Sequence, residues 1–138
     1  MNTFDIDDIK IEKEGTDMQI LHPATGEPLW EERTDEETGK VGSIPVTLQL
    51  VGQDSDIYKK ISNRITNKRV KMKAGRLTAE RMDSDNAEII EGCTVGWSSN
   101  LVLSGAAPAN AKEIYQGRKW LRDQAEQHIH DRANYLGN

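Results

Sequence analysis

Hydrophobic and polar residues alternate in the segment SIPVTLQLVG, residues 43–52. Ile44, Val46, Leu48 and Leu50 fall on one face of an extended chain, and the residues between them fall on the other. Pro45 lies near the start of the segment, where a proline is tolerated in an edge strand. The pattern predicts a β-strand with one buried face.

Two shorter apolar segments precede this strand. Met18–Leu21 and Leu29–Trp30 flank the sequence Pro-Ala-Thr-Gly at residues 23–26, whose proline and glycine are typical of a tight turn. We therefore expect a β-hairpin here, and a mostly antiparallel sheet of two or three strands within residues 17–52. A sheet of this size is marginally stable alone, so helices must cover it.

Helical periodicity begins after Gly52. Asp54 or Ser55 can cap a first helix, in which Ile57, Ile61, Ile65 and Met72 form one apolar stripe and Lys73–Gly75 mark the end. A second helix is expected at about residues 78–94, with Met82, Ile89, Ile90 and Cys93 on one side. The following segment TVGWSSN, residues 94–100, is predicted to end it, with Gly96 as the stop and Trp97 as a packed anchor.

The C-terminal third predicts two more helices. Pro108 fits the first position of a short helix ending near Gly117. A final helix at about residues 118–136 carries Leu121, Ala125, Ile129, Arg132 and Leu136 on one stripe. The predicted fold class is therefore α+β, with a small N-terminal antiparallel sheet followed by three to four helices at about residues 54–137. Residues 1–16 are predicted to be a flexible acidic arm, and residues 17–138 a single domain.

The amino-acid composition predicts a small hydrophobic core. Apolar residues are 36% of the 138 and charged residues 30%, and the seven aromatic side chains leave little to fill the interior. A second chain is therefore expected to complete some of the apolar surface. The single cysteine and the lack of an apolar run of membrane-spanning length favour a soluble, cytoplasmic protein.

Charge is distributed unevenly. Residues 1–40 contain twelve acidic and four basic residues, a balance of −8, whereas residues 57–81 contain nine basic residues and one acidic residue, a balance of +8. This separation indicates either intramolecular pairing or head-to-tail contact between copies of the chain, and a homo-oligomer is predicted.

The cluster His128-Ile129-His130-Asp131 is the most suggestive chemical motif. Residues two apart on a helix are separated by about 200°, so His128 and His130 point to opposite sides and cannot share a metal ion. His128 lies beside the apolar stripe and is expected to pack, and His22 has no ligand-like neighbour.

Other candidate chemistry fails on its spacing. Asp83 and Asp85 resemble the start of a calcium loop, but the glycine and oxygen ligands that must follow are missing. Cys93 is expected to be a buried residue rather than a nucleophile. We therefore predict no catalytic, cofactor-binding or metal-binding residues, no cofactor and no enzymatic activity.

The basic segment at residues 57–81 carries the charge needed to bind phosphate or carboxylate groups. Its predicted basic patch consists of Lys60, Arg64, Lys68, Arg69 and Lys71. Tyr58 is the one aromatic residue nearby, so the patch lacks the stacking platform that single-stranded nucleic acids need, and there is no recognisable helix-turn-helix. An acidic segment of protein is the favoured partner, and a nucleic-acid-binding regulator remains an alternative.

Three stretches resemble a known group of proteins: HPATGEPL leading into IPVTLQLVGQDSDIYKKISNRITNKRV, then AEIIEGCTVGWSSN, and finally NAKEIYQGRKWLRDQAEQHIHDRANYL. Together they are similar to the small tail assembly chaperones, or tail assembly proteins, of tailed bacteriophages and prophages. The resemblance covers about residues 18–136, and its most specific parts are TVGW, the segment Asn110–Tyr115 and DRANYL. It implies a non-enzymatic protein of the host bacterial cytoplasm that binds the tape measure protein and/or the tail tube protein during virion morphogenesis.

The final helix offers the candidate binding surface for such a partner. Its exposed stripe would consist of Trp120, Leu121, Ala125, Ile129, Tyr135 and Leu136. Alternatively, this stripe simply packs on the helix that carries Ile57–Ile65. A structural tail or connector subunit of the virion is the alternative function.

Overall fold

The computed structural model describes residues 3–9, 14–72 and 75–136. It confirms the predicted α+β class: two small antiparallel sheets are combined with four α-helices among these residues. The elements, in chain order, are η1 (Ile6–Asp8), β1 (Thr16–Gln19), β2 (Trp30–Thr34), β3 (Val41–Pro45), β4 (Thr47–Leu50), α1 (Asp56–Val70), α2 (Ala79–Cys93), β5 (Thr94–Trp97), α3 (Ala111–Tyr115), α4 (Lys119–His130) and η2 (Arg132–Tyr135).

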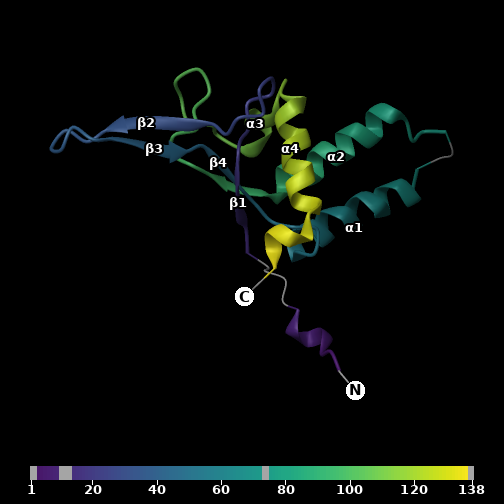
Figure 1. The fold of residues 1–138 in the computed structure, drawn as a ribbon. Coiled ribbons are helices and arrows are strands. Elements are labelled where there is room, and N and C mark those ends of the chain that lie inside the picture. The colour runs from purple at the N-terminus through teal and green to yellow at the C-terminus, as the bar shows by residue number, and fades with distance from the viewer. Residues whose placement is uncertain (1–2, 10–13, 73–74, 137–138) are drawn as a thin grey trace.

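A three-stranded sheet in the order β1-β4-β5 forms the centre of the molecule (Figure 1). In the register, Met18 lies opposite Leu48 and Leu48 lies opposite Trp97, so these side chains share the inner face. Helices α2 and α4 pack on that face, where the core is formed by Leu48 and Leu50 of β4, Met18 and Ile20 near β1, Ile90 and Cys93 of α2, and Leu121, Ala125 and Ile129 of α4. The opposite face carries polar and exposed residues, as is usual for an antiparallel sheet covered on one side.

Strands β2 and β3 form a separate two-stranded ribbon that projects away from the body (Figure 1). The loop at its tip is held by Asp35, whose carboxylate accepts a hydrogen bond of 2.8 Å from the Glu37 amide. Gly39 has a φ of +68°, a left-handed conformation that glycine adopts without strain. Residues 35–40 thus form the turn of a hairpin.

The predicted strand at residues 44–51 is in fact divided between the two sheets. Pro45 ends β3, and Val46 connects it to β4, donating its amide to the Leu29 carbonyl at 3.1 Å and accepting from the Ile20 amide at 3.0 Å. The predicted hairpin around residues 23–26 keeps its turn, with the Gly26 amide donating to the His22 carbonyl at 2.8 Å. Its two strands then diverge, because β1 pairs with β4 and β2 pairs with β3.

A strand was missed within the region predicted to be helical. Thr94–Trp97 forms β5 beside β4, rather than only ending α2 as predicted. Thr94 is the C-terminal cap of α2 and lies in the extended region, so the chain passes directly from helix to strand. The strands therefore do not all precede the helices.

Helices α1 and α2 form a hairpin that projects on the side of the molecule opposite the ribbon (Figure 1). Ser55 caps α1, since its hydroxyl accepts from the Tyr58 amide, and Thr78 caps α2 in the same way. The predicted α1 stripe is wrong at Ile57, which is 41% exposed, while Tyr58 packs against the core instead. On α2, Met82 is likewise exposed. The predicted end of α1 at Lys73–Gly75 includes residues 73–74, which lie outside the described residues.

The last predicted helix is two elements. α4 ends at His130, and Asp131 caps the short η2, accepting a hydrogen bond of 3.1 Å from the Ala133 amide. Pro108 is buried three residues before α3, so it does not hold the predicted first position; α3 begins at Ala111, and Asn110 caps it. None of the helices in the described part of the chain combines the length and the apolar content of a membrane span. The predicted acidic arm includes residues 1–2 and 10–13, which are outside the described residues, as are residues 137–138.

Candidate functional site

The three histidines all support local structure. His128 shares a hydrogen bond of 2.8 Å with the Thr16 hydroxyl, and its ring lies edge-on to Tyr135 at 5.6 Å. His130 contacts Gln53 and Tyr58 instead, so the two side chains diverge as helix geometry predicts. His22 accepts hydrogen bonds from the Ala24 and Thr25 amides and thereby organises the turn.

Burial lowers the pKa of His128, and the nearby carboxylates of Asp131 and Asp17 offset part of this effect. The neutral imidazole is therefore favoured in the folded protein. A group in this state can pack beside Tyr135 without a counter-ion.

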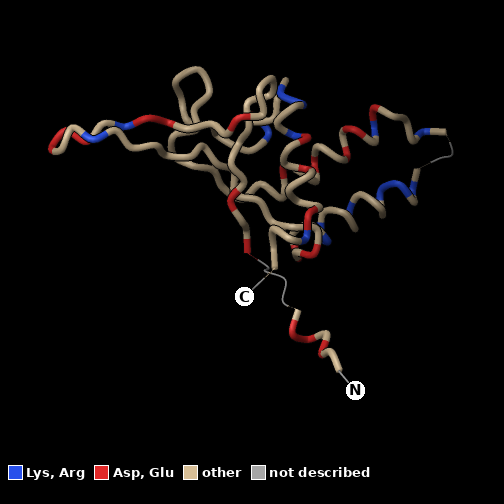
Figure 2. Tube along the Cα trace, viewed as in Figure 1, with Lys and Arg blue, Asp and Glu red and all other residues tan. Residues whose placement is uncertain are grey.

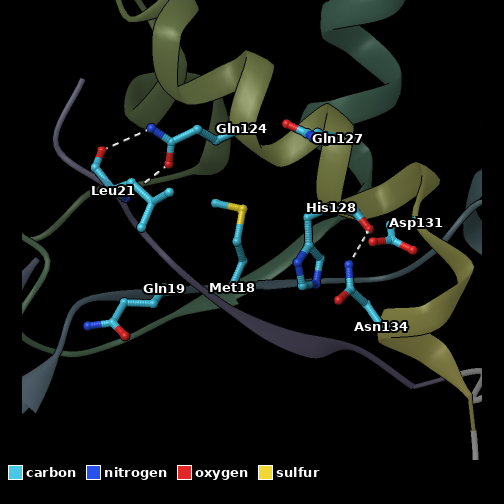
Figure 3. A pocket seen from close by; sticks show the side chains of 8 residues that line it. All are labelled: Met18, Gln19, Leu21, Gln124, Gln127, His128, Asp131 and Asn134. Atoms are coloured by element: carbon cyan, nitrogen blue, oxygen red, sulfur yellow. Dashed lines mark hydrogen bonds between the residues drawn. The ribbon is translucent and has the colours of Figure 1, made fainter. Parts of the chain in front are cut away.

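A cavity of about 220 Å³ lies between β1 and the α4–η2 segment, beside His128 (Figure 3). Gln124 points toward the chain at Leu21, where its side-chain amide accepts from the Leu21 nitrogen at 3.0 Å and donates to the Leu21 oxygen at 2.9 Å. Asn134 donates to the His128 carbonyl at 3.1 Å. Gln124 and Asn134 therefore both bond to the backbone of the protein itself.

The remaining reactive side chains are also engaged in structure. Burial raises the pKa of the Cys93 thiol to about 12, so this group stays protonated near neutral pH and is a poor nucleophile. Asp85 is buried and bonds to Arg69 at 3.1 Å, and Asp83 pairs with Arg122 at 2.6 Å. Asp85 therefore joins α1 to α2, and Asp83 joins α2 to α4. No group of three or more potential metal ligands occurs among the described residues.

Most of the predicted partner-binding residues are inside the protein. Leu121, Ala125, Ile129 and Tyr135 are buried, and α4 packs the first three against α2 and the sheet rather than against the helix of Ile57–Ile65. They cannot form an exposed stripe in this fold. Trp120 and Leu136 keep part of their surface exposed, at opposite ends of the α4–η2 segment.

Trp120 borders an apolar pocket that the sequence analysis did not find. The pocket has a volume of about 180 Å³ and lies between the start of α4 and the loop at residues 101–106. Its lining is mainly aliphatic and includes Leu29, Leu101, Ile114 and the side of Leu121. Val102, which is 50% exposed, and Trp120, which is 36% exposed, are its most accessible apolar side chains.

The predicted basic patch divides into two sets. Arg64 pairs with Glu88, and Arg69 pairs with Asp85, so two of the five bases bind acidic residues of α2. Lys60, Lys68 and Lys71 form no ion pair with the carboxylates of the described residues. With Arg64, these lysines line one face of α1, together with Ile61, Asn63 and Asn67.

Helix α2 supplies the acidic residues that pair with the bases of α1. Its residues 79–93 contain five acidic residues and one basic residue, a balance of −4, against a balance of +4 for residues 56–70 of α1. The two helices therefore partly neutralise each other. No ion pair among the described residues joins residues 1–40 to residues 57–81.

The β2–β3 ribbon is a second surface that was not predicted. Because residues opposite each other share a face, Trp30, Glu32 and Val41 lie on one side of it. Trp30 is 53% exposed and Val41 is 64% exposed. On the other side Arg33 binds Glu31 at 2.8 Å. Residues 30–34 read Trp-Glu-Glu-Arg-Thr and show no apolar–polar alternation, because the strand is largely exposed on both faces.

Three surface features stand out among the described residues: an apolar pocket at Trp120, a basic face on α1 and a projecting acidic ribbon. No known protein family, curated protein or solved structure is significantly similar to the chain.

Proposed function

We propose that the chain is a non-enzymatic tail assembly chaperone of a tailed bacteriophage or prophage. It binds the tape measure protein, tail tube subunits or both, in the host bacterial cytoplasm before the tail tube is complete. The resemblance of residues 18–136 to such proteins supports this proposal, as does the engagement of the histidines and Cys93 in packing.

The apolar pocket at Trp120 is the observation that carries the proposal. A cavity of about 150 Å³ lined by aliphatic and aromatic side chains accepts a benzene molecule, so a pocket of about 180 Å³ has room for one large apolar side chain. Anchoring one such side chain in a pocket is how many protein interfaces gain most of their affinity. The occupant is an apolar side chain of the tape measure protein.

Copurification tests this function. The chain and the tape measure protein encoded beside it are coexpressed, and the partner is recovered through a tag on the chain. We expect a stable complex and an increase in the soluble fraction of the partner. Recovery of no complex, with no change in the partner's solubility, would contradict the proposal.

A matched pair of variants locates the contact. Val102→Asp places a charge at the mouth of the pocket and is expected to reduce recovery of the partner at least tenfold, which corresponds to about 1.4 kcal/mol. Val95→Asp makes the same change at a residue of similar exposure, 45%, on the open face of the sheet, and should leave recovery unchanged. Equal losses in both variants would show that binding does not depend on the pocket.

Mass spectrometry of purified virus particles distinguishes a chaperone from a structural subunit of the virion. A chaperone is expected to be absent from them, and a stoichiometric amount would favour the structural role.

The nucleic-acid alternative is weakened by the pairing of Arg64 and Arg69 with α2, because paired bases contribute less to neutralising phosphates.

A further inference from the structure

We propose that the chain assembles head to tail, with the β2–β3 ribbon of one copy docked on the basic face of α1 of the next copy. This inference concerns the contact between copies and does not rest on the proposed function. The observation behind it is a pair of oppositely charged, uncovered surfaces that a single molecule cannot bring together.

The ribbon has an excess of acidic groups. Residues 30–45 contain five acidic and two basic residues, a balance of −3. Arg33 and Glu31 neutralise each other, and Asp35 holds the turn. Glu32, Glu36 and Glu37 remain as exposed carboxylates without an ion pair among the described residues.

The basic face of α1 offers the complementary groups. Lys60, Lys68 and Lys71 lie along it without ion pairs among the described residues, and Ile57, one turn before Ile61, keeps 41% of its surface exposed. The ribbon provides Trp30 and Val41 beside its carboxylates. Each surface therefore combines charge with an exposed apolar side chain.

The two surfaces lie on opposite sides of the molecule, so pairing must occur between copies. Figure 2 shows acidic residues at the tip of the ribbon and basic residues along α1, separated by the central sheet and α4. Accordingly, no ion pair joins them among the described residues. A contact between two different surfaces of identical chains is heterologous, and it produces rings or open filaments rather than closed dimers.

The ribbon also needs a partner on physical grounds. A two-stranded hairpin is marginally stable in water, and its outer edges carry unpaired backbone groups. If two ribbons paired with each other, two segments that each carry a net charge of −3 would repel. Docking on a basic helix covers the ribbon without that repulsion.

Charge-swapped variants test the contact by sedimentation velocity. The ribbon variant carries Glu32→Lys, Glu36→Lys and Glu37→Lys, and the helix variant carries Lys60→Glu, Lys68→Glu and Lys71→Glu; Arg64 is left in place because it pairs with Glu88. We expect the unmodified chain to associate at low salt and to dissociate at about 1 M salt, where charges act over only about 3 Å. Each variant alone should sediment as a monomer.

Two combinations restore the contact if charge pairing is responsible. A mixture of the two variants should form a 1:1 complex, and the chain carrying all six changes, which has the original net charge, should associate again. A control with Glu14→Lys, Asp17→Lys and Glu27→Lys gives the same change of net charge as the ribbon variant and should leave association intact. All three control residues are exposed and lie outside the ribbon.

Three results would overturn the contact. The first is that the unmodified chain stays monomeric at low salt and at concentrations up to about 1 mM, the weak end of specific association. The second is that the helix variant or the ribbon variant associates as the unmodified chain does. The third is that the chain with all six changes stays monomeric. Copurification with the tape measure protein is measured separately. If the chain is monomeric but still recovers the tape measure protein, only the head-to-tail contact is refuted. If the chain associates but does not recover the tape measure protein, only the proposed function is refuted.

Discussion

His128 shows how a single titratable residue can contribute to stability without serving chemistry. Its imidazole bonds to Thr16 of β1 and packs against Tyr135 of η2, so it connects three elements. Burial lowers its pKa, and protonation of the ring therefore opposes folding.

The consequence is a dependence of stability on pH. Above the ordinary pKa of 6.5, His128 is neutral in both the folded and the unfolded chain, and its contribution is fully present. As the pH falls below that value, the unfolded chain takes up the proton first, and the contribution is lost as the pH passes through the lowered pKa of the folded state. We expect the free energy of unfolding to decrease more steeply between about pH 7 and pH 5 in the unmodified chain than in His128→Gln.

Urea denaturation at several pH values measures this difference. Since the carboxylates titrate in both proteins, the difference between the two curves isolates His128. Parallel curves would show that the imidazole titrates alike in the folded and unfolded chains.

At the scale of elements, packing rather than pattern decides where strands and helices lie. The alternation at residues 44–50 correctly predicted extended chain and the burial of Leu48 and Leu50. It could not show that Val46 passes from one sheet to another, because that depends on the distant backbone groups of Leu29 and Ile20. The segment at Thr94–Trp97 is too short to show a period, so its pairing with β4 was not predictable.

The same limit applies to the candidate site. Helical geometry alone predicted that His128 and His130 diverge. The apolar stripe of α4 was predicted from its spacing, but spacing does not show whether another element of the same chain covers it. The pocket at Trp120 combines Ile20, which follows β1, with residues from the loop at residues 101–106, α3 and α4, and only the tertiary structure brings these together.

The C-terminal η2 provides a test of close packing between elements. A Cβ added at Gly52 would lie 2.8 Å from the ring of Tyr135, whose side chain is buried and whose hydroxyl donates to the Leu50 carbonyl at 3.2 Å. Because the ring cannot move aside without losing that bond, we expect Gly52→Ala to lower the free energy of unfolding by about 1–3 kcal/mol. Gly42→Ala is the control, since its nearest neighbour is 3.9 Å away, and it should change stability by less than about 0.5 kcal/mol.

Denaturation with urea compares the two glycine variants. If both were equally stable, the close contact between Gly52 and Tyr135 would not constrain the fold. Through this contact Tyr135 packs into the core, although it belongs to the short 3-10 helix η2.

At the scale of the whole molecule, the central sheet and its helices form a body with two projections. The ribbon and the α1–α2 hairpin extend to opposite sides of it (Figure 1). The pocket at Trp120 lies on the body itself. Head-to-tail contacts through the projections would leave the pocket of each copy uncovered. An array of such pockets can bind a long partner at many points, and linked weak contacts of this kind add up to high avidity.

Hydrogen–deuterium exchange of the chain, alone and in complex with the tape measure protein, tests the central claim most directly. Backbone amides covered by a partner or stabilised by it exchange more slowly. We predict that binding slows exchange at residues 101–106 and 118–121, which surround the pocket, and leaves β5 and the open face of the sheet unchanged. Slower exchange confined to other segments, with residues 101–106 unaffected, would contradict the account.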